Sequence, residues 1–169
     1  HKRKNLANML RAFDIFKERT GSDVKFLVVG AKAGAQDDLE EVYAKMKFAD
    51  EVRFLGHLKS TELSKLMASA LALLYVSLFE GFGIPIVEAF HAETAVSTST
   101  VTSMPEVAGD AALLVDPLSV GQIADAMTQV TTDDALRQQL IERGKLQRQK
   151  FSWDQTAAKL WNCVEKAMK

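Results

Sequence analysis

The chain has 169 residues, enough for one domain with a sizeable buried core and too few for two ordinary domains. Hydrophobic residues make up 47%, charged residues 25%, and the net charge is −1, which argues against a nucleic-acid binder driven by bulk electrostatics. The single cysteine, Cys163, excludes a disulfide within the chain, and the absence of a CxxC zinc pattern favours a reducing, cytoplasmic setting.

The longest apolar run, residues 66–79, contains two serines and is short for a helix that crosses a membrane. It is typical of a buried helix end followed by a core strand. No signal peptide is visible. We therefore expect a soluble, cytoplasmic protein.

The first half of the chain alternates between helical and extended patterns. Apolar residues recur at helical spacing from Leu6 onward, and two β-branched or apolar runs end in Gly30 and Gly56. The patterns predict helices over residues 5–18, 37–48 and 60–70, and strands over residues 24–30, 51–56 and 71–77.

The second half continues the alternation after a glycine-rich loop. Capping-box spacing marks two helix starts, Ser103 with Glu106 and Ser152 with Gln155. The patterns predict strands over residues 95–99 and 111–116, and helices over residues 85–93, 103–109, 119–131, 133–149 and 153–168.

The predicted fold class is α/β, with a Rossmann-like, doubly wound parallel sheet in a single domain. The strands alternate with helices and are apolar throughout, which is typical of a parallel sheet buried on both faces. Such sheets bind ligands at the carboxyl ends of their strands. Gly30, Gly56 and the pair Gly81 and Gly83 directly follow predicted strands, so we expect the binding site there.

The segment "FEGFGIPIVE", residues 79–88, carries the most specific chemistry. Gly81 and Gly83 let the backbone approach a ligand closely. The helix that follows directs free N–H groups and its positive dipole end at the same space, and Pro85 fits its first turn. The loop therefore predicts a phosphate or diphosphate site.

Glu80 and Glu88 flank this loop, and a carboxylate beside a phosphate needs another partner. Carboxylates accept hydrogen bonds from the paired hydroxyls of a sugar or ribose, so the two glutamates indicate a nucleotide sugar. Two alternatives stay open. Glu88 would complement the helix dipole while Glu80 is solvated, or both would hold Mg²⁺ with a diphosphate, although no further Asp or Asn lies close by.

Three segments carry a family resemblance: "SLFEGFGIPIVEAF", "TSTVTSMPEVAGDAALLVDP" and "FSWD". Together they resemble the carboxyl-terminal, donor-binding half of the retaining glycosyltransferases of family 4, the glycosyl transferases of group 1. The resemblance extends from "KRKNL" to "FSWD", nearly the whole chain. It implies one half of a GT-B fold, in which two Rossmann-like domains face each other across a cleft.

The resemblance assigns roles around the glycine loop. Glu88 would hold the ribose hydroxyls of the donor, and Glu80 would contact the transferred sugar near its reacting centre. Lys4 would neutralise the diphosphate, so that no metal is needed. The remaining donor-binding residues of the loop would be Gly81, Phe82, Gly83, Ile84 and Pro85.

Other strand ends would complete the donor site. Gly30 ends one strand, and His57 and Leu58 would lie beside the nucleobase, where backbone contacts usually suffice. The chain departs from the family pattern at Val76, Glu93 and Ala95. The family's strand before "RKN", which ends in an arginine that grips the diphosphate, and its amino-terminal acceptor domain are not in this sequence.

We therefore interpret residues 1–169 as a nucleotide-sugar binding domain. The full enzyme would transfer a sugar from a UDP- or GDP-linked donor, with retention, to a glycan or lipid-linked acceptor, without nucleic acid or further cofactor and in peripheral association with a membrane. The piece alone is expected to be inactive. The alternatives are a non-catalytic nucleotide-binding module and the inactive half of a partner-dependent transferase.

Overall fold

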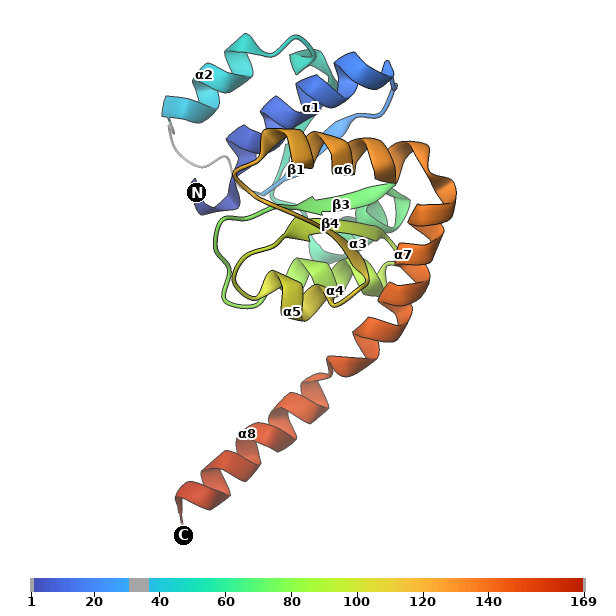
Figure 1. Cartoon of the computed structure of the whole chain (residues 1–169). Coiled ribbons are helices and arrows are strands. Elements are labelled where there is room, and N and C mark those ends of the chain that lie inside the picture. The colour runs from blue at the N-terminus through green and yellow to red at the C-terminus, as the bar shows by residue number, and fades with distance from the viewer. Residues whose placement is uncertain (1, 31–36, 169) are drawn as a thin grey trace.

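The computed structural model describes residues 2–30 and 37–168 (Figure 1). The α-helices are α1 (Leu6–Thr20), α2 (Asp37–Lys45), α3 (Ser60–Ser69), α4 (Ile84–His91), α5 (Met104–Ala108), α6 (Val120–Thr132), α7 (Asp134–Gln147) and α8 (Trp153–Ala167). The strands are β1 (Phe26–Val29), β2 (Val52–Gly56), β3 (Ala72–Tyr75), β4 (Ala95–Ser99) and β5 (Ala112–Val115). Short 3₁₀ helices cover η1 (Lys2–Lys4), η2 (Ala49–Glu51) and η3 (Arg148–Lys150).

All described strand pairs are parallel, which confirms the predicted α/β class. Within the described residues the strands form two hydrogen-bonded sheets, β1–β2 and β3–β4–β5, and not one continuous sheet. Phe26 lies opposite Val52 in the first sheet. In the second sheet Val96 lies between Leu73 and Ala112.

One hydrophobic core spans both sheets on the face covered by α1 and α6. Phe13 of α1 stacks on Phe26 of β1 with ring centroids 5.4 Å apart, and the same cluster contains Leu74 of β3 and Ile123 of α6. α1 and α6 lie side by side over this face (Figure 1). Each large side chain buried there stabilises the fold by about 1.5–3 kcal/mol, so the two sheets are held as one body although their backbones do not pair.

Among the described residues, the opposite face is covered over the second sheet but not over β1. Ile86 and Phe90 of α4 and Met104 of α5 pack with Val96 of β4. All five residues of β4 are buried, as predicted for a strand covered on both faces. The same prediction is wrong for β1, whose residues alternate between half-buried and exposed because only one of its faces is covered.

α7 packs closely against α4 at Gly144. A Cβ atom at this position would lie 2.7 Å from the ring of Phe90, so only glycine permits the approach. Just beyond α7, the Arg148 guanidinium donates a hydrogen bond of 3.1 Å to the Phe90 carbonyl. These contacts fix the end of the globular body.

α8 projects away from that body (Figure 1), and all of its residues are exposed. The Ser152 side chain accepts a hydrogen bond from the Gln155 amide, which confirms the predicted helix start. Leu160 and Trp161 are 66% and 64% exposed. Among the described residues, no helix combines the length and the apolar composition that a membrane span requires.

Candidate functional site

The glycine loop between β3 and α4 is fixed by the residues just after β4. The Glu80 amide donates a hydrogen bond of 3.3 Å to the Thr102 hydroxyl. The Ser103 hydroxyl lies 3.0 Å from the Glu80 carbonyl and 2.8 Å from the Phe82 carbonyl, and donates to them. Ser103 therefore secures the loop and is not a side-chain helix cap, which corrects the predicted capping box with Glu106.

The loop ends in a left-handed turn that starts α4. Gly83 has φ 105°, a conformation that favours glycine, and a Cβ there would lie 3.2 Å from Ile86. α4 begins at Ile84, with Pro85 in its first turn, so the first amides of the helix have no partner within it. The space around Gly81 is open. The open space at Gly81 and the first turn of α4 therefore adjoin each other, and anion binding there stays a prediction.

Glu80 lies at the centre of a charged cluster just before this turn. Glu80 is only 9% exposed. Arg3 Nη1 lies 2.6 Å from its Oε2 atom, and Lys4 Nζ lies 2.7 Å from its Oε1 atom. The Lys4 contact lies outside hydrogen-bond geometry, so within the described residues Oε1 is paired by charge alone. The buried carboxylate therefore has a cation beside each of its two oxygens.

Burial and the neighbouring charges act in opposite directions on this cluster. Burial would raise the pKa of Glu80, but Lys4, Ser77 and Arg3 together hold that pKa below its usual value. Burial would lower the pKa of Lys4, but Glu80 and Tyr75 raise it above its usual value. The carboxylate and the ammonium are therefore both charged at neutral pH.

The two cations reach Glu80 because η1 is attached to the ends of two strands. Asn5 adopts a left-handed conformation with φ 60°, and its amide donates hydrogen bonds to the carbonyls of Val76, at 3.0 Å, and Pro117, at 2.7 Å. The Leu78 amide donates to the Arg3 carbonyl at 2.7 Å. η1 therefore lies across the carboxyl end of the second sheet.

Tyr75, the last residue of β3, orients Lys4. Lys4 Nζ donates a hydrogen bond of 3.0 Å to the Tyr75 hydroxyl and lies 4.8 Å from the centroid of its ring. The sequence did not identify Arg3, Asn5 or Tyr75 as part of the site. The only local signal was the "RKN" triplet, because asparagine tolerates the left-handed conformation better than most residues.

The structure unites some predicted site residues and leaves others apart. Glu80 and Lys4 are brought together, beside the loop of residues 81–85. Glu88 lies about one turn into α4 and is exposed. The ring of Phe82 packs edge-on against Phe151, so the "FSWD" segment begins next to the loop.

The remaining predicted residues belong to the first sheet. The Gly30 amide donates a hydrogen bond of 2.7 Å to the Gly56 carbonyl, so β1 and β2 end together. His57 is exposed and Leu58 is half-buried in the segment that follows β2. Gly30, His57 and Leu58 lie at the carboxyl end of the first sheet. Glu80 and Lys4 lie at the carboxyl end of the second sheet.

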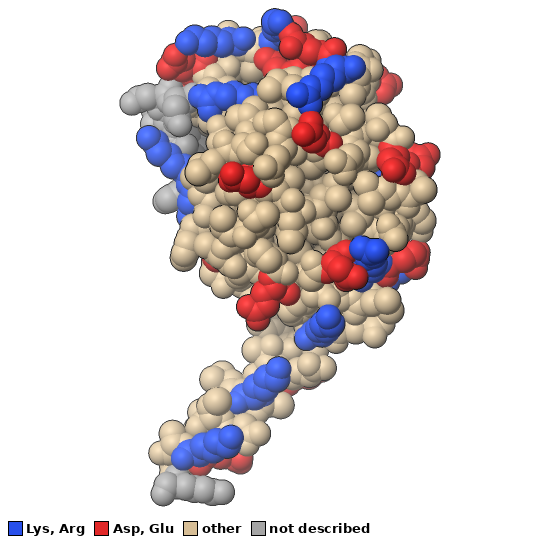
Figure 2. All heavy atoms as spheres, in the orientation of Figure 1, with Lys and Arg blue, Asp and Glu red and all other residues tan. Residues whose placement is uncertain are grey.

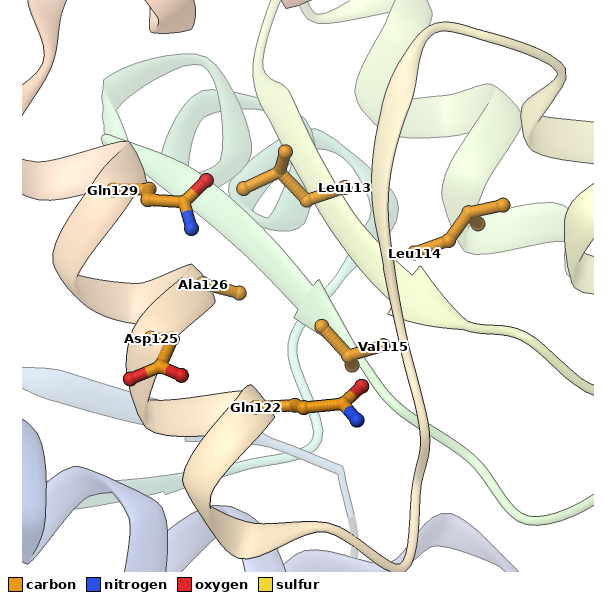
Figure 3. Close-up of a pocket in the computed structure, with 7 residues that line it drawn as sticks. All are labelled: Leu113, Leu114, Val115, Gln122, Asp125, Ala126 and Gln129. Atoms are coloured by element: carbon orange, nitrogen blue, oxygen red, sulfur yellow. The ribbon is translucent and has the colours of Figure 1, made fainter.

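A separate pocket of about 190 Å³ lies between β5 and α6 (Figure 3). Two of its polar side chains already have structural partners. Asp125 pairs with Arg19 at 2.6 Å, and Gln122 Oε1 accepts a hydrogen bond of 3.0 Å from the Asp116 amide. The pocket contains none of the predicted site residues.

Among the described residues, neither the charged nor the metal-binding side chains mark a second candidate site. On the face shown in Figure 2, basic and acidic side chains are interspersed. Within residues 2–30 and 37–168, no group of three or more His, Cys, Asp or Glu side chains is placed to hold a metal ion. The glycine loop and the Glu80 cluster are therefore the candidate site.

Comparison with known families covers the part of the chain that contains this site. A model of the family "Glycosyl transferases group 1" matches residues 1–147, which include the glycine loop and the Glu80 cluster. The chain belongs to this family.

Among the curated proteins that are similar to this chain, O-antigen chain mannosyltransferase B of Escherichia coli is 33% identical over 96% of the chain and 43% of that protein. MMP alpha-(1->4)-mannosyltransferase of Mycolicibacterium hassiacum is 29% identical over 98% of the chain and 40% of that protein. The chain thus spans less than half the length of these relatives.

Solved structures of the same architecture cover most of the chain. The C-terminal domain of a glycosyl transferase group 1 family protein, LpcC, from Francisella tularensis has a TM-score of 0.76 at 26% identity, over 89% of this chain and 80% of that one. Sucrose-phosphate synthase from Thermosynechococcus elongatus has a TM-score of 0.86 at 21% identity, over 99% of this chain and 43% of that one. The second likeness concerns the fold alone.

Proposed function

We propose that this group 1 domain binds the donor of a retaining glycosyltransferase, a sugar linked to a nucleoside diphosphate. One arrangement supports the proposal above all others. The buried Glu80 carboxylate, the Lys4 ammonium and the amino-terminal turn of α4 converge on the loop that follows β3. An anion and a sugar hydroxyl could be bound side by side there.

Each group has a chemical task in this scheme. Lys4, Arg3 and the free amides of Phe82, Gly83 and Ile84 would hold the diphosphate, because all of them offer positive charge or N–H donors. Glu88, exposed on α4, would accept hydrogen bonds from a pair of ribose hydroxyls. Glu80 would accept one from the transferred sugar.

The reaction exchanges one bond at the anomeric carbon of the sugar. The bond to the diphosphate oxygen breaks, the acceptor oxygen bonds to the same face, and the proton of the acceptor hydroxyl passes to the leaving diphosphate oxygen. Negative charge develops on the leaving diphosphate, where Lys4 and Arg3 would stabilise it without a metal or other cofactor. A second domain would supply the acceptor, a glycan or a lipid-linked sugar.

Two features of the donor can be proposed more narrowly. The O-antigen and MMP relatives are both named mannosyltransferases, so we propose a mannosyl donor. The base is proposed to be uracil or guanine, read by backbone groups near His57 and Leu58. Cytoplasmic location and peripheral membrane contact of the full enzyme belong to the same proposal.

Calorimetric titration with UDP, GDP and ADP tests the proposal. The chain is expected to bind one of the three in preference, and Glu88→Ala is expected to weaken that binding about tenfold, since it removes charged hydrogen bonds to the ribose. Glu165→Ala is the matched control, because Glu165 is an exposed helical glutamate on the projecting α8.

Equal binding by the wild type and Glu88→Ala would contradict the assigned ribose contact. Binding of none of the three nucleotides would contradict the donor site. If a longer protein that contains this chain bound the nucleotide but transferred no sugar, a non-catalytic nucleotide-binding module would be the better description.

A further inference from the structure

Within the described residues, Arg3 and Lys4 both pair with Glu80, a carboxylate of the protein itself. Arg3 Nη1 lies 2.6 Å from Glu80 Oε2, and Lys4 Nζ lies 2.7 Å from Glu80 Oε1. The carboxylate therefore bridges both cations, one with each oxygen. This is the arrangement in which a phosphate group would meet them, because carboxylate and phosphate oxygens accept from the same donors.

We propose that Glu80 occupies the anion subsite of Arg3 and Lys4 in the unliganded chain, and that a diphosphate displaces it. The inference rests on the proposed function for the identity of that diphosphate. Glu80 then competes with the diphosphate for Arg3 and Lys4. The displaced carboxylate becomes available to a sugar hydroxyl only when the diphosphate has taken the two cations.

The exposure of the three side chains supports such an exchange. The Arg3 and Lys4 side chains are 42% and 41% exposed, whereas the Glu80 side chain is 10% exposed. An anion from solvent can therefore approach the cations from their open side. The carboxylate, covered by the protein, does not block that approach.

The backbone is held in place on both sides of the cluster. Asn5 and the bond from the Leu78 amide to the Arg3 carbonyl fix η1, and Thr102 and Ser103 fix the backbone of Glu80. The exchange therefore requires only side-chain rotation. Tyr75 retains a hydrogen bond to Lys4 when the carboxylate turns away.

Inorganic pyrophosphate is the probe that isolates this competition, since it carries no sugar and no base. Glu80→Gln keeps the size of the side chain and removes its charge. It is expected to bind pyrophosphate at least about threefold more tightly than the wild type, because two ion pairs no longer have to be broken. Thermal unfolding of both proteins checks that the variant is folded.

Glu93→Gln is the matched control. Glu93 is also bridged by one lysine and one arginine, with Lys145 Nζ at 3.1 Å and Arg148 Nη2 at 3.7 Å, but it lies after α4 and outside the site. Its replacement is expected to leave pyrophosphate affinity unchanged. A gain in Glu93→Gln equal to that in Glu80→Gln would overturn the inference, since the effect would then come from net charge alone.

Unchanged or weaker pyrophosphate binding by Glu80→Gln, or no binding by either protein, would also overturn the inference. The proposed function fails separately. If Glu80→Gln binds pyrophosphate more tightly but no nucleoside diphosphate binds better than pyrophosphate, the self-occupied anion subsite stands and the nucleotide donor does not.

Discussion

At the level of single residues, the site depends on contacts between distant parts of the chain. The hydrogen bond from Arg3 to Glu80 joins residues 77 positions apart, and Asn5 reaches Pro117 over 112 positions. Sequence patterns describe neighbours a few residues apart. Glu80 and Lys4 were therefore found through the family resemblance, whereas the partners Arg3, Asn5 and Tyr75 were not predicted.

Asn5 is expected to be the most sensitive of these positions. Asn5→Ala removes two buried hydrogen bonds and forces alanine into a left-handed conformation, which should lower the free energy of unfolding by about 2–4 kcal/mol. Urea denaturation measures the loss. Asn8→Ala is the control, because the Asn8 amide donates to the same Pro117 carbonyl, at 3.2 Å, from within α1.

The control should lose less than about 1 kcal/mol, since alanine is a better helix former and the two hydrogen bonds that it removes, to Pro117 and from Arg11, are half-buried and exposed. Asn5→Gly should fall between the two variants, because glycine adopts the left-handed conformation without strain. Equal losses for Asn5→Ala and Asn8→Ala would mean that Asn5 does not fix η1 in the way described.

Tyr75 is expected to affect ligand binding rather than folding. Tyr75→Phe keeps the ring beneath Lys4 but removes the hydroxyl that accepts its hydrogen bond, so pyrophosphate affinity should fall about threefold to tenfold. Tyr43→Phe is a matched control, since the Tyr43 hydroxyl donates to the Ala49 carbonyl at 3.2 Å, near β2. An equal loss in both variants, measured by calorimetry, would remove Tyr75 from the site.

At the level of elements, the sequence predicted every strand and the order of helices, but not how the strands pair. The apolar pattern of β1 and β3 marks both as core strands, and both contribute to the core beneath α1 and α6. Which edges meet depends on three-dimensional packing. In the common doubly wound strand order, the strand that precedes the first helix lies between the strands that correspond to β1 and β3.

The helix starts show the same limit. Ser152 caps α8 as its spacing predicted, because its Gln155 partner is local. Ser103 has the same spacing to Glu106, yet its hydroxyl donates to carbonyls of the glycine loop. A tertiary contact took precedence over the local one, and no sequence pattern distinguishes the two cases.

The split between the sheets predicts a difference in backbone protection. On β1, Leu27 and Val29 are 40% and 37% exposed, and the edge of β1 that does not pair with β2 has no strand partner among the described residues. Amides of β1 and β3 are therefore expected to exchange hydrogen faster than those of β4, which is paired on both edges. Exchange monitored by mass spectrometry or NMR measures this, and equal protection of the five strands would contradict the split.

At the level of the whole molecule, the chain is a parallel α/β body with one projecting helix. A 15-residue helix without packing partners is marginal in water, so α8 with its exposed Trp161 differs in kind from the helices of the body. The body presents the carboxyl ends of both sets of strands. The donor proposal requires that one ligand be bound across this edge by both sheets.

Mapping a bound nucleoside diphosphate by amide chemical shifts tests that central claim most directly. The ligand would be the one preferred in the calorimetric titration. We predict large shift changes in residues 81–84 and around Lys4 from the second sheet, together with Gly30, His57 and Leu58 from the first. Changes confined to one sheet, or centred on the pocket between β5 and α6, would contradict the account.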